Sequence, residues 1–200
     1  MYLPEISIRL IRMDKEFFSR RTATVARDLI GKYIVRYDRV DLIGRIVEVE
    51  AYGGSNDPAS HAARGKTQRN EVMFKKPGTA YVYFIYGNHY CLNVVAHVGS
   101  SAGAVLIRAL EPISGIEQMK KYRSLQDALR LASGPGRLTK AMNIDRTFNG
   151  IDLVSDETLS IQTTDEPYLK YGTSKRIGIR KGTDRPWRFF AVDNRFVSKR

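Results

Sequence analysis

The segment from residue 81 to residue 97, YVYFIYGNHYCLNVVAH, constrains the fold more than any other part of the chain. Aromatic and β-branched residues fill both of its halves, and Gly87-Asn88 lies between them. Because Gly and Asn tolerate the positive φ of tight turns, the pattern predicts two antiparallel strands joined by a turn. If side chains alternate, Tyr81, Tyr83 and Ile85 share one face of the first strand. We therefore expect a hairpin that is either an ordinary part of the core or an aromatic platform for a flat ligand such as a nucleobase.

The rest of the pattern predicts short helices inserted between antiparallel strands. Asp14 is placed to cap a helix over residues 16–30, which Gly31 would end, and Ser114 is placed to cap a later helix. Strands are expected at residues 32–37, 42–52, 104–110, 159–162, 177–179, 187–192 and 196–198, a long loop at 53–76, and further helices at 125–132 and after Ser133-Gly134-Pro135-Gly136. These elements predict one α+β domain over residues 1–200, with a curved, mainly antiparallel sheet, surrounding helices and a protruding hairpin.

Positive charge is concentrated in two segments of a chain whose formal net charge is +12. Residues 170–200 hold ten Lys or Arg against two Asp, and residues 64–76 hold five against one Glu. A basic surface of this kind fits a polyanion, of which nucleic acid is the commonest in a cell. The alternative is a basic surface that only keeps the protein soluble.

Neither a membrane span nor a disulfide is expected. No apolar run approaches the roughly 20 residues that a membrane span needs, and the first residues lack the pattern of a signal peptide. The single cysteine, Cys91, cannot form an internal disulfide. We expect an intracellular protein, located in the cytoplasm or nucleoid if it is bacterial.

Glu50 is the first candidate for chemistry, because alternation along the strand places it on one face with Ile46, Glu48 and Tyr52. Glu50 could form a salt bridge with Arg45 or Arg108, or it could act as a general base. A glycosidase-like pair of Glu48 and Glu50 is disfavoured, since both carboxylates would reach the same side of a sugar.

Metal and phosphate-loop chemistry find little support in the sequence. No pair among His61, His89, Cys91 and His97 has zinc-finger spacing, so no metal is expected. The chain contains neither a Walker loop nor a dinucleotide-binding fingerprint. Asn93 could be an ordinary strand residue or an amide that reads the edge of a base.

Several of these segments, in this order and spacing, together resemble one family. They are residues 44–52 (GRIVEVEAY), 57–61 (DPASH), 73–87 (MFKKPGTAYVYFIYG), Asn93, 106–112 (LIRALEP) and 133–135 (SGP). Over residues 14–196 the chain resembles the mammalian-type alkyladenine (3-methyladenine) DNA glycosylases. It departs from the mammalian pattern at Asn88 and His89, where that pattern has Met-Tyr, and its loop after His61 is one residue shorter.

The resemblance implies a role for each matched residue. Glu50 would activate a water, which Arg108 and the backbone carbonyl of Ile177 would hold. Tyr52 would stack on one face of a flipped purine, and His61 and Tyr83 on the other. Tyr86 would fill the gap left in the DNA stack, and Asn93 would crowd the 2-amino group of guanine.

The implied function is that of a base-excision-repair DNA glycosylase. It would flip alkylated or deaminated purines, of the 3-methyladenine, hypoxanthine and ethenoadenine class, out of duplex DNA. Hydrolysis of the N-glycosidic bond would leave an abasic site, without a cofactor and without strand cleavage. The expected partner is double-stranded DNA with damaged purines, bound by a monomer. The alternative is a non-enzymatic nucleic-acid-binding module whose tyrosines stack on bases.

Overall fold

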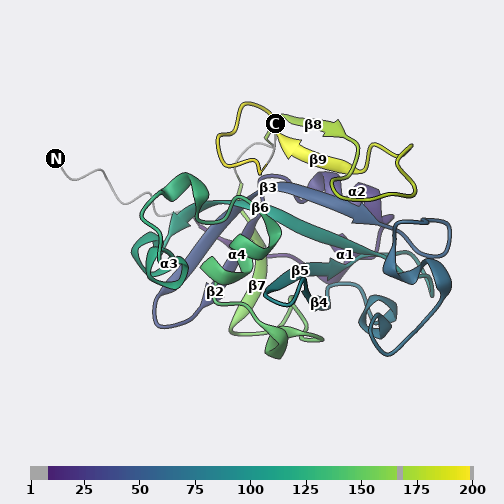
Figure 1. Cartoon of the computed structure of the whole chain (residues 1–200). Coiled ribbons are helices and arrows are strands. Elements are labelled where there is room, and N and C mark those ends of the chain that lie inside the picture. The colour runs from purple at the N-terminus through teal and green to yellow at the C-terminus, as the bar shows by residue number, and fades with distance from the viewer. Residues whose placement is uncertain (1–8, 166–168, 199–200) are drawn as a thin grey trace.

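The computed structural model describes residues 9–165 and 169–198, and their strands form one curved antiparallel sheet (Figure 1). The described strands of this sheet number nine. Seven of them lie side by side in the order β1-β7-β2-β3-β6-β5-β4, and the other two, β8 and β9, pair with each other, with β9 also paired to β3. The strands are β1 (Ile11–Arg12), β2 (Tyr33–Tyr37), β3 (Asp41–Tyr52), β4 (Ala80–Ile85), β5 (His89–Val95), β6 (Ala104–Ser114), β7 (Leu159–Thr163), β8 (Tyr171–Ser174) and β9 (Arg188–Ala191). The predicted α+β class is confirmed.

Short helices surround this sheet and pack on its main core. The α-helices are α1 (Lys15–Phe18), α2 (Thr22–Asp28), α3 (Ile116–Arg123) and α4 (Pro135–Ala141), and single 3-10 turns occur at His61–Arg64, Glu71–Phe74, Ala128–Arg130 and Arg146–Phe148. Leu29 beside α2, Met119 of α3 and Leu138 of α4 are fully buried in one apolar cluster with residues of β3 and β6. Within the described ranges no helix is long and apolar enough to cross a membrane.

The long strand β3 is the centre of the sheet. It pairs with β2 through its first half, with β9 through residues 48–50 and with β6 along nearly its whole length. The register to β6 shifts between Ile46 and Glu48. Because of this irregularity Ile46 and Val47 both lie in the main core, so the prediction that Ile46 shares a face with Glu48 is wrong.

The predicted hairpin is present as β4 and β5, joined by a turn at residues 86–88. Tyr83 lies opposite Cys91, and Tyr81 opposite Asn93. Tyr81 is fully buried, whereas Tyr83 is only partly covered. The hairpin therefore contributes one ring to a small buried cluster and leaves another accessible beside it.

Several predicted element boundaries are wrong. The helix expected over residues 16–30 is divided into α1 and α2, although Asp14 caps α1 by accepting a hydrogen bond from the Phe17 amide. Strand β6 continues through Pro112, which pairs at a register irregularity beside Gly44 where a missing N–H is tolerated. Gly115, with φ of +71°, then begins α3 in place of Ser114.

Four further predicted elements differ in the structure. Residues 125–132 form only one 3-10 turn, and the long loop at 53–76 contains two such turns. Residues 177–179 and 196–198 are not strands, and the strand of that region lies earlier, at β8. Lys199 and Arg200 of the basic C-terminal segment lie outside the described residues.

Candidate active site

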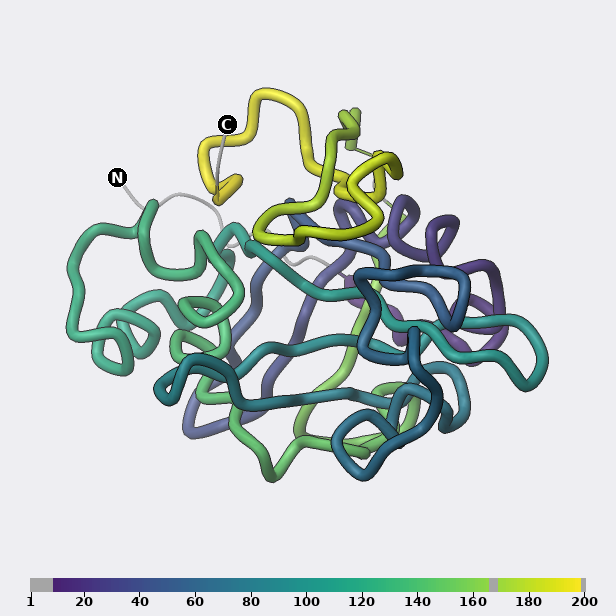
Figure 2. Tube along the Cα trace, turned by 45° about the vertical axis from the view of Figure 1, so that its right-hand side comes forward, coloured from purple at the N-terminus to yellow at the C-terminus, as the bar shows by residue number. Residues whose placement is uncertain are grey.

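A cavity of about 760 Å³ opens between the hairpin, the loop after β3 and the segment after β8. Figure 2 shows these segments, which are far apart in the sequence, grouped around the sheet. Seven of the eight predicted site residues line the cavity: Tyr52, His61, Tyr83, Tyr86, Asn93, Arg108 and Ile177. The eighth, Glu50, is fully buried directly behind that lining. The fold thus brings every predicted site residue to one place.

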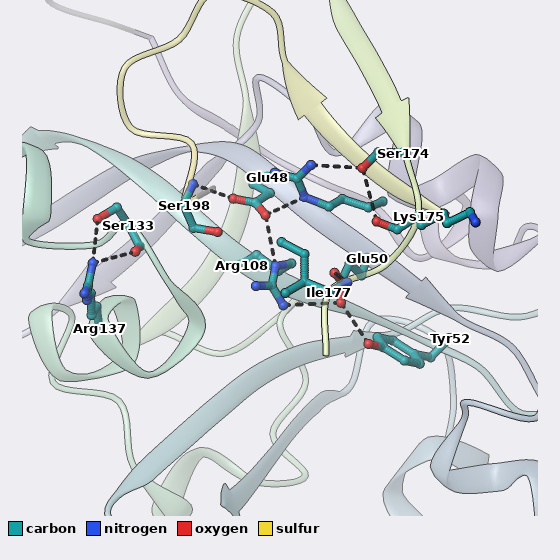
Figure 3. A network of polar contacts seen from close by, with 11 residues as sticks. Glu48, Glu50, Tyr52, Arg108, Ser133, Arg137, Ser174, Lys175, Ile177 and Ser198 are labelled. Atoms are coloured by element: carbon teal, nitrogen blue, oxygen red, sulfur yellow. Dashed lines mark hydrogen bonds and ion pairs between the residues drawn. The ribbon is translucent and has the colours of Figure 1, made fainter. Parts of the chain in front are cut away.

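The Glu50 carboxylate accepts three hydrogen bonds from groups that line the cavity (Figure 3). Oε2 accepts from the Tyr52 hydroxyl at 2.8 Å and from Nη1 of Arg108 at 3.3 Å. Oε1 accepts from the backbone amide of Ile177 at 2.7 Å. The family resemblance assigns the carbonyl of Ile177 to the reacting water, and the structure adds a contact between the N–H of Ile177 and Glu50. A carboxylate has about four acceptor positions, so one position remains for a further donor.

The environment of Glu50 keeps the neighbouring Tyr52 and Arg108 side chains protonated. Burial, reinforced by the charge of Glu50, raises the pKa of Tyr52, so its hydroxyl stays protonated and acts as a donor. Burial lowers the pKa of Arg108, but the charges of Glu50 and Glu48 outweigh burial and raise it above its ordinary value. Arg108 is therefore a permanent cation at the cavity wall.

His61 and Tyr83 form an aromatic pair in the cavity lining. The two rings meet edge to face with centroids 4.8 Å apart, and His61 Nδ1 lies 3.0 Å from the Tyr81 hydroxyl. Desolvation, together with the charge of Arg69, lowers the pKa of His61. At neutral pH the imidazole is thus mostly uncharged, and Nε2 has no partner among the described residues.

Asn93 is held rigidly in the cavity floor. Its Nδ2 donates to the backbone oxygens of Tyr81 at 2.9 Å and Cys91 at 3.4 Å. Asn93 is 4% exposed, and its Oδ1 has no hydrogen-bond partner in the described part of the chain. The side chain cannot move away from a ligand without breaking these bonds.

Tyr86 occupies the apex of the hairpin in an uncommon conformation. The residue is 85% exposed and has φ of +55°, a region that costs non-glycine residues about 1–2 kcal/mol. The hairpin below it is braced by α4, because a Cβ added to Gly136 would lie 2.7 Å from His89 Cγ. Thr139 also donates to the Tyr90 carbonyl at 3.0 Å. An exposed, strained aromatic residue on a rigid support is typical of a binding site.

Asp57 and Arg176 form a buried ion pair that the sequence analysis missed. Arg176 Nη1 and Nη2 donate to the two Asp57 oxygens at 2.6 and 2.8 Å, and both side chains are fully buried. The guanidinium also lies 4.7 Å from the centre of the Tyr52 ring. Asp57 falls in a segment that carries the family resemblance, but no local pattern indicates a contact with a residue 119 positions away.

This ion pair fixes the side of the cavity next to Glu50. Asp57 accepts from the Gly53 amide, and Arg176 donates to the Ala51 carbonyl, so the end of β3 is tied to the segment after β8. Because Arg176 precedes Ile177, the same pair determines where the Ile177 amide meets Glu50.

Among the described residues, no cluster of His, Cys, Asp and Glu suited to a metal ion occurs.

The Asp57 pair predicts a specific pH dependence of stability. Burial raises the pKa of Asp57, but the bonds from Arg176 and Gly53 outweigh it and hold the pKa below the ordinary value of 3.8. The unfolded chain therefore binds the proton more readily, and the contribution of the pair is complete above that pH and lost as pH falls below it. We expect Asp57→Asn to lower the free energy of unfolding by about 3–5 kcal/mol at pH 7, with a smaller loss at pH 3.

Urea unfolding at both pH values measures this difference. Asp184→Asn, which changes an exposed carboxylate nearby, is the matched control and should stay within about 0.5 kcal/mol of wild type. A loss for Asp57→Asn that is equal at pH 7 and pH 3 would contradict the assignment.

The chain is similar to known proteins over most of its length. Residues 16–195 match the family model described as methylpurine-DNA glycosylase (MPG). A protein of Carboxydothermus hydrogenoformans is 49% identical over 94% of this chain and 99% of its own length. Proteins of Koribacter versatilis and Clostridium perfringens are 46% and 42% identical, over 98% and 95% of this chain and 98% and 100% of their own lengths. The names of all three relatives refer to a 3-methyladenine DNA glycosylase.

Proposed function

The chain belongs to the methylpurine-DNA glycosylase family, and from this premise we propose that it excises alkylated and deaminated purines with a water activated by Glu50. The observation that carries the proposal is the position of Glu50, whose buried carboxylate is bonded by three groups of the cavity wall. A carboxylate held in this way keeps a fixed geometry toward anything that enters the cavity.

The cavity fits a purine that has been flipped out of the duplex. In this proposal Tyr52 stacks on one face of the base and His61 with Tyr83 lies against the other, which is supported by the position of all three rings in the lining of one cavity. The Tyr81 hydroxyl is 3.0 Å from His61 Nδ1 but 3.4 Å from the Arg69 carbonyl. If the Tyr81 hydroxyl donates to Nδ1 over the shorter contact, the single ring proton of the neutral imidazole is on Nε2, which can donate to the 6-position of the purine.

Hydrolysis of an alkylated purine then requires one carboxylate, whereas a neutral purine such as hypoxanthine must also take up a proton as it leaves. The water gives a proton to Glu50 while its oxygen forms a bond to C1′ of the sugar. The C1′–N bond breaks, and its electron pair leaves with the base. A purine alkylated at N3 or N7 is already cationic, so it departs as a neutral molecule without protonation by an acid. The products are the free base and an abasic site in an intact strand.

Binding of the duplex is assigned to the cavity rim and the hairpin apex. Arg137, Arg180 and Lys181 line the open side of the cavity, where phosphates of the flipped nucleotide would pass. Tyr86 is placed to enter the stack as the base leaves it. A flipped base costs a few kcal/mol of stacking and pairing, and an inserted ring offsets part of that cost.

Replacement of Glu50 by Gln should abolish most of the excision. The amide keeps the shape of the side chain but cannot take the proton from water, and general-base catalysis contributes about 10²–10⁴-fold to a rate. We expect a loss of this size in single-turnover excision from a hypoxanthine-containing duplex, read as strand cleavage after alkali. Affinity for the same duplex should change only a few-fold. Binding with undiminished excision would show that Glu50 is structural.

The wedge role predicts that Tyr86→Ser weakens binding to lesion duplex, whereas Tyr86→Phe binds as wild type does, because the ring alone replaces the lost stacking. Phe84→Ser is the matched control, since Phe84 is also an exposed aromatic residue, 48% accessible, but precedes the turn. Equilibrium binding to duplexes with and without hypoxanthine measures the effect. Equal losses for the Tyr86→Ser and Phe84→Ser variants would indicate a general apolar contact in place of a wedge.

The filter role predicts that Asn93→Ser lets normal guanine enter the cavity. The shorter side chain no longer crowds the 2-amino group, and a pocket that rejects by crowding is relaxed by such a change. Release of free guanine from undamaged duplex should rise above the wild-type level and should disappear in the Glu50→Gln/Asn93→Ser double variant. Guanine release no higher than that of wild type would remove Asn93 from this role.

A further inference from the structure

Glu48 is a buried carboxylate for which the hydrolysis described above has no use. It lies two residues before Glu50 on β3, is 0% exposed and does not line the cavity. Its Oε1 accepts from Nε of Arg108 at 3.0 Å and from Nε of Arg188 at 2.8 Å. Its Oε2 accepts from the backbone amide of Ser198 at 2.7 Å. Figure 3 shows Glu48 and Glu50 on the same side of β3, with Arg108 between them.

Arg108 is shared unequally by the two carboxylates. Its Nε bonds to Glu48 at 3.0 Å, while its Nη1 reaches Glu50 at 3.3 Å. The guanidinium is planar and rigid, so fixing its Nε edge on Glu48 also fixes the direction of its Nη groups. Arginine and carboxylate otherwise prefer a bidentate pair, with two parallel N–H···O bonds. With its Nε on Glu48, Arg108 reaches Glu50 through Nη1 alone and forms no such pair with it.

The way in which Arg108 is shared determines how many acceptor positions of Glu50 are free for the reacting water. A bidentate pair with Arg108 would occupy one acceptor position on each Glu50 oxygen, in addition to those used by Tyr52 and Ile177. All four positions would then be taken, and the carboxylate could not accept a proton from water. With Arg108 held by Glu48, one position stays free.

The groups around Glu48 keep its carboxylate charged, so it can hold Arg108. Burial pushes its pKa upward, but the bonds from Ser198 and Arg188 and the charge of Arg108 outweigh burial and hold the pKa below the ordinary value. The Ser198 amide also brings the C-terminal segment to the cavity wall, which Ser198 itself lines. Residues of β3, β6, β9 and the C-terminal segment thus meet at one carboxylate.

We propose that Glu48 is a positioning residue, which holds Arg108 away from a bidentate pair with Glu50 and so keeps Glu50 open to the reacting water. The inference rests on the proposed function, because it assigns Glu48 a part in the same hydrolysis. The alternative is that Glu48 merely joins strands. The Arg45–Glu111 pair is such a connection. Its Nη2–Oε2 distance is 2.8 Å, it links β3 and β6, and neither residue lines the cavity.

A double-mutant cycle separates these two roles. The proteins are wild type, Glu48→Gln, Arg108→Met and the double variant, with Glu111→Gln as the matched control. Single-turnover excision of hypoxanthine is measured with saturating enzyme, together with duplex affinity and thermal unfolding. We expect Glu48→Gln to slow excision roughly 10–100-fold, as loss of groups that orient a reactive ligand does. Its affinity for the duplex should stay within a few-fold, and Glu111→Gln should excise at the wild-type rate.

The decisive comparison is made in the Arg108→Met background. If Glu48 acts through Arg108, adding Glu48→Gln there should slow excision by less than about 2-fold, because the group that it positions is already gone. If Glu48→Gln does not fold, Glu48→Asp replaces it throughout, since it keeps the charge but is too short to hold Arg108 in place. Its loss of rate should likewise vanish in the Arg108→Met background.

Three outcomes would overturn the inference. They are wild-type excision by the Glu48 variant, wild-type excision by Arg108→Met, or an equal slowing by the Glu48 change in both backgrounds. Failure of the proposed function is distinguishable from these outcomes, because in that case the wild-type protein itself would release no hypoxanthine.

Discussion

Two buried carboxylates on one strand constrain everything around the cavity. Glu48 and Glu50 are both fully covered, and a buried ion is tolerated only when it is paired and hydrogen-bonded. The partners come from distant parts of the chain: Arg108 from β6, Arg188 from β9, and amides from the segments around Ile177 and Ser198. The sheet must therefore bring β6 and β9 to opposite edges of β3 before either charge can be buried. Assembly of the site therefore depends on the sheet as a whole, because leaving out any one of these segments removes a donor from at least one buried carboxylate.

The hairpin holds several cavity-lining side chains at fixed positions relative to one another. Its strands carry Tyr83 and Asn93 toward the cavity and Tyr86 at the apex, while α4 supports it from behind. Bonds from Asn93 to the Tyr81 and Cys91 backbone couple the cavity floor to the strand pairing itself. A rigid support of this kind suits a site that must select by crowding, since a floor that could yield would admit the wrong base. The strained backbone of Tyr86 is maintained by the same support.

The sequence predicted which residues meet at the cavity better than it predicted the bounds of the elements that carry them. Alternation along residues 48–52 and the tyrosine-rich hairpin follow local rules, and the family resemblance added roles that no local rule contains. The bulge at Val47, the continuation of β6 through Pro112 and the division of the first helix depend on tertiary contacts, so local propensity could not predict them. The same holds for the pairs Asp57–Arg176 and Glu48–Arg188, whose members are 119 and 140 residues apart. Such contacts are visible only once the sheet order is known.

A crystal structure of the Glu50→Gln variant bound to duplex DNA that contains hypoxanthine tests the central claim most directly. The claim is that the cavity is a base pocket with position 50 at the sugar. The account predicts that the lesion base lies between Tyr52 and the His61–Tyr83 pair, with the side chain of residue 50 facing C1′ and Tyr86 in the vacated stack. A lesion base that remains stacked in the duplex, or one that enters the cavity with C1′ turned away from residue 50, would contradict it.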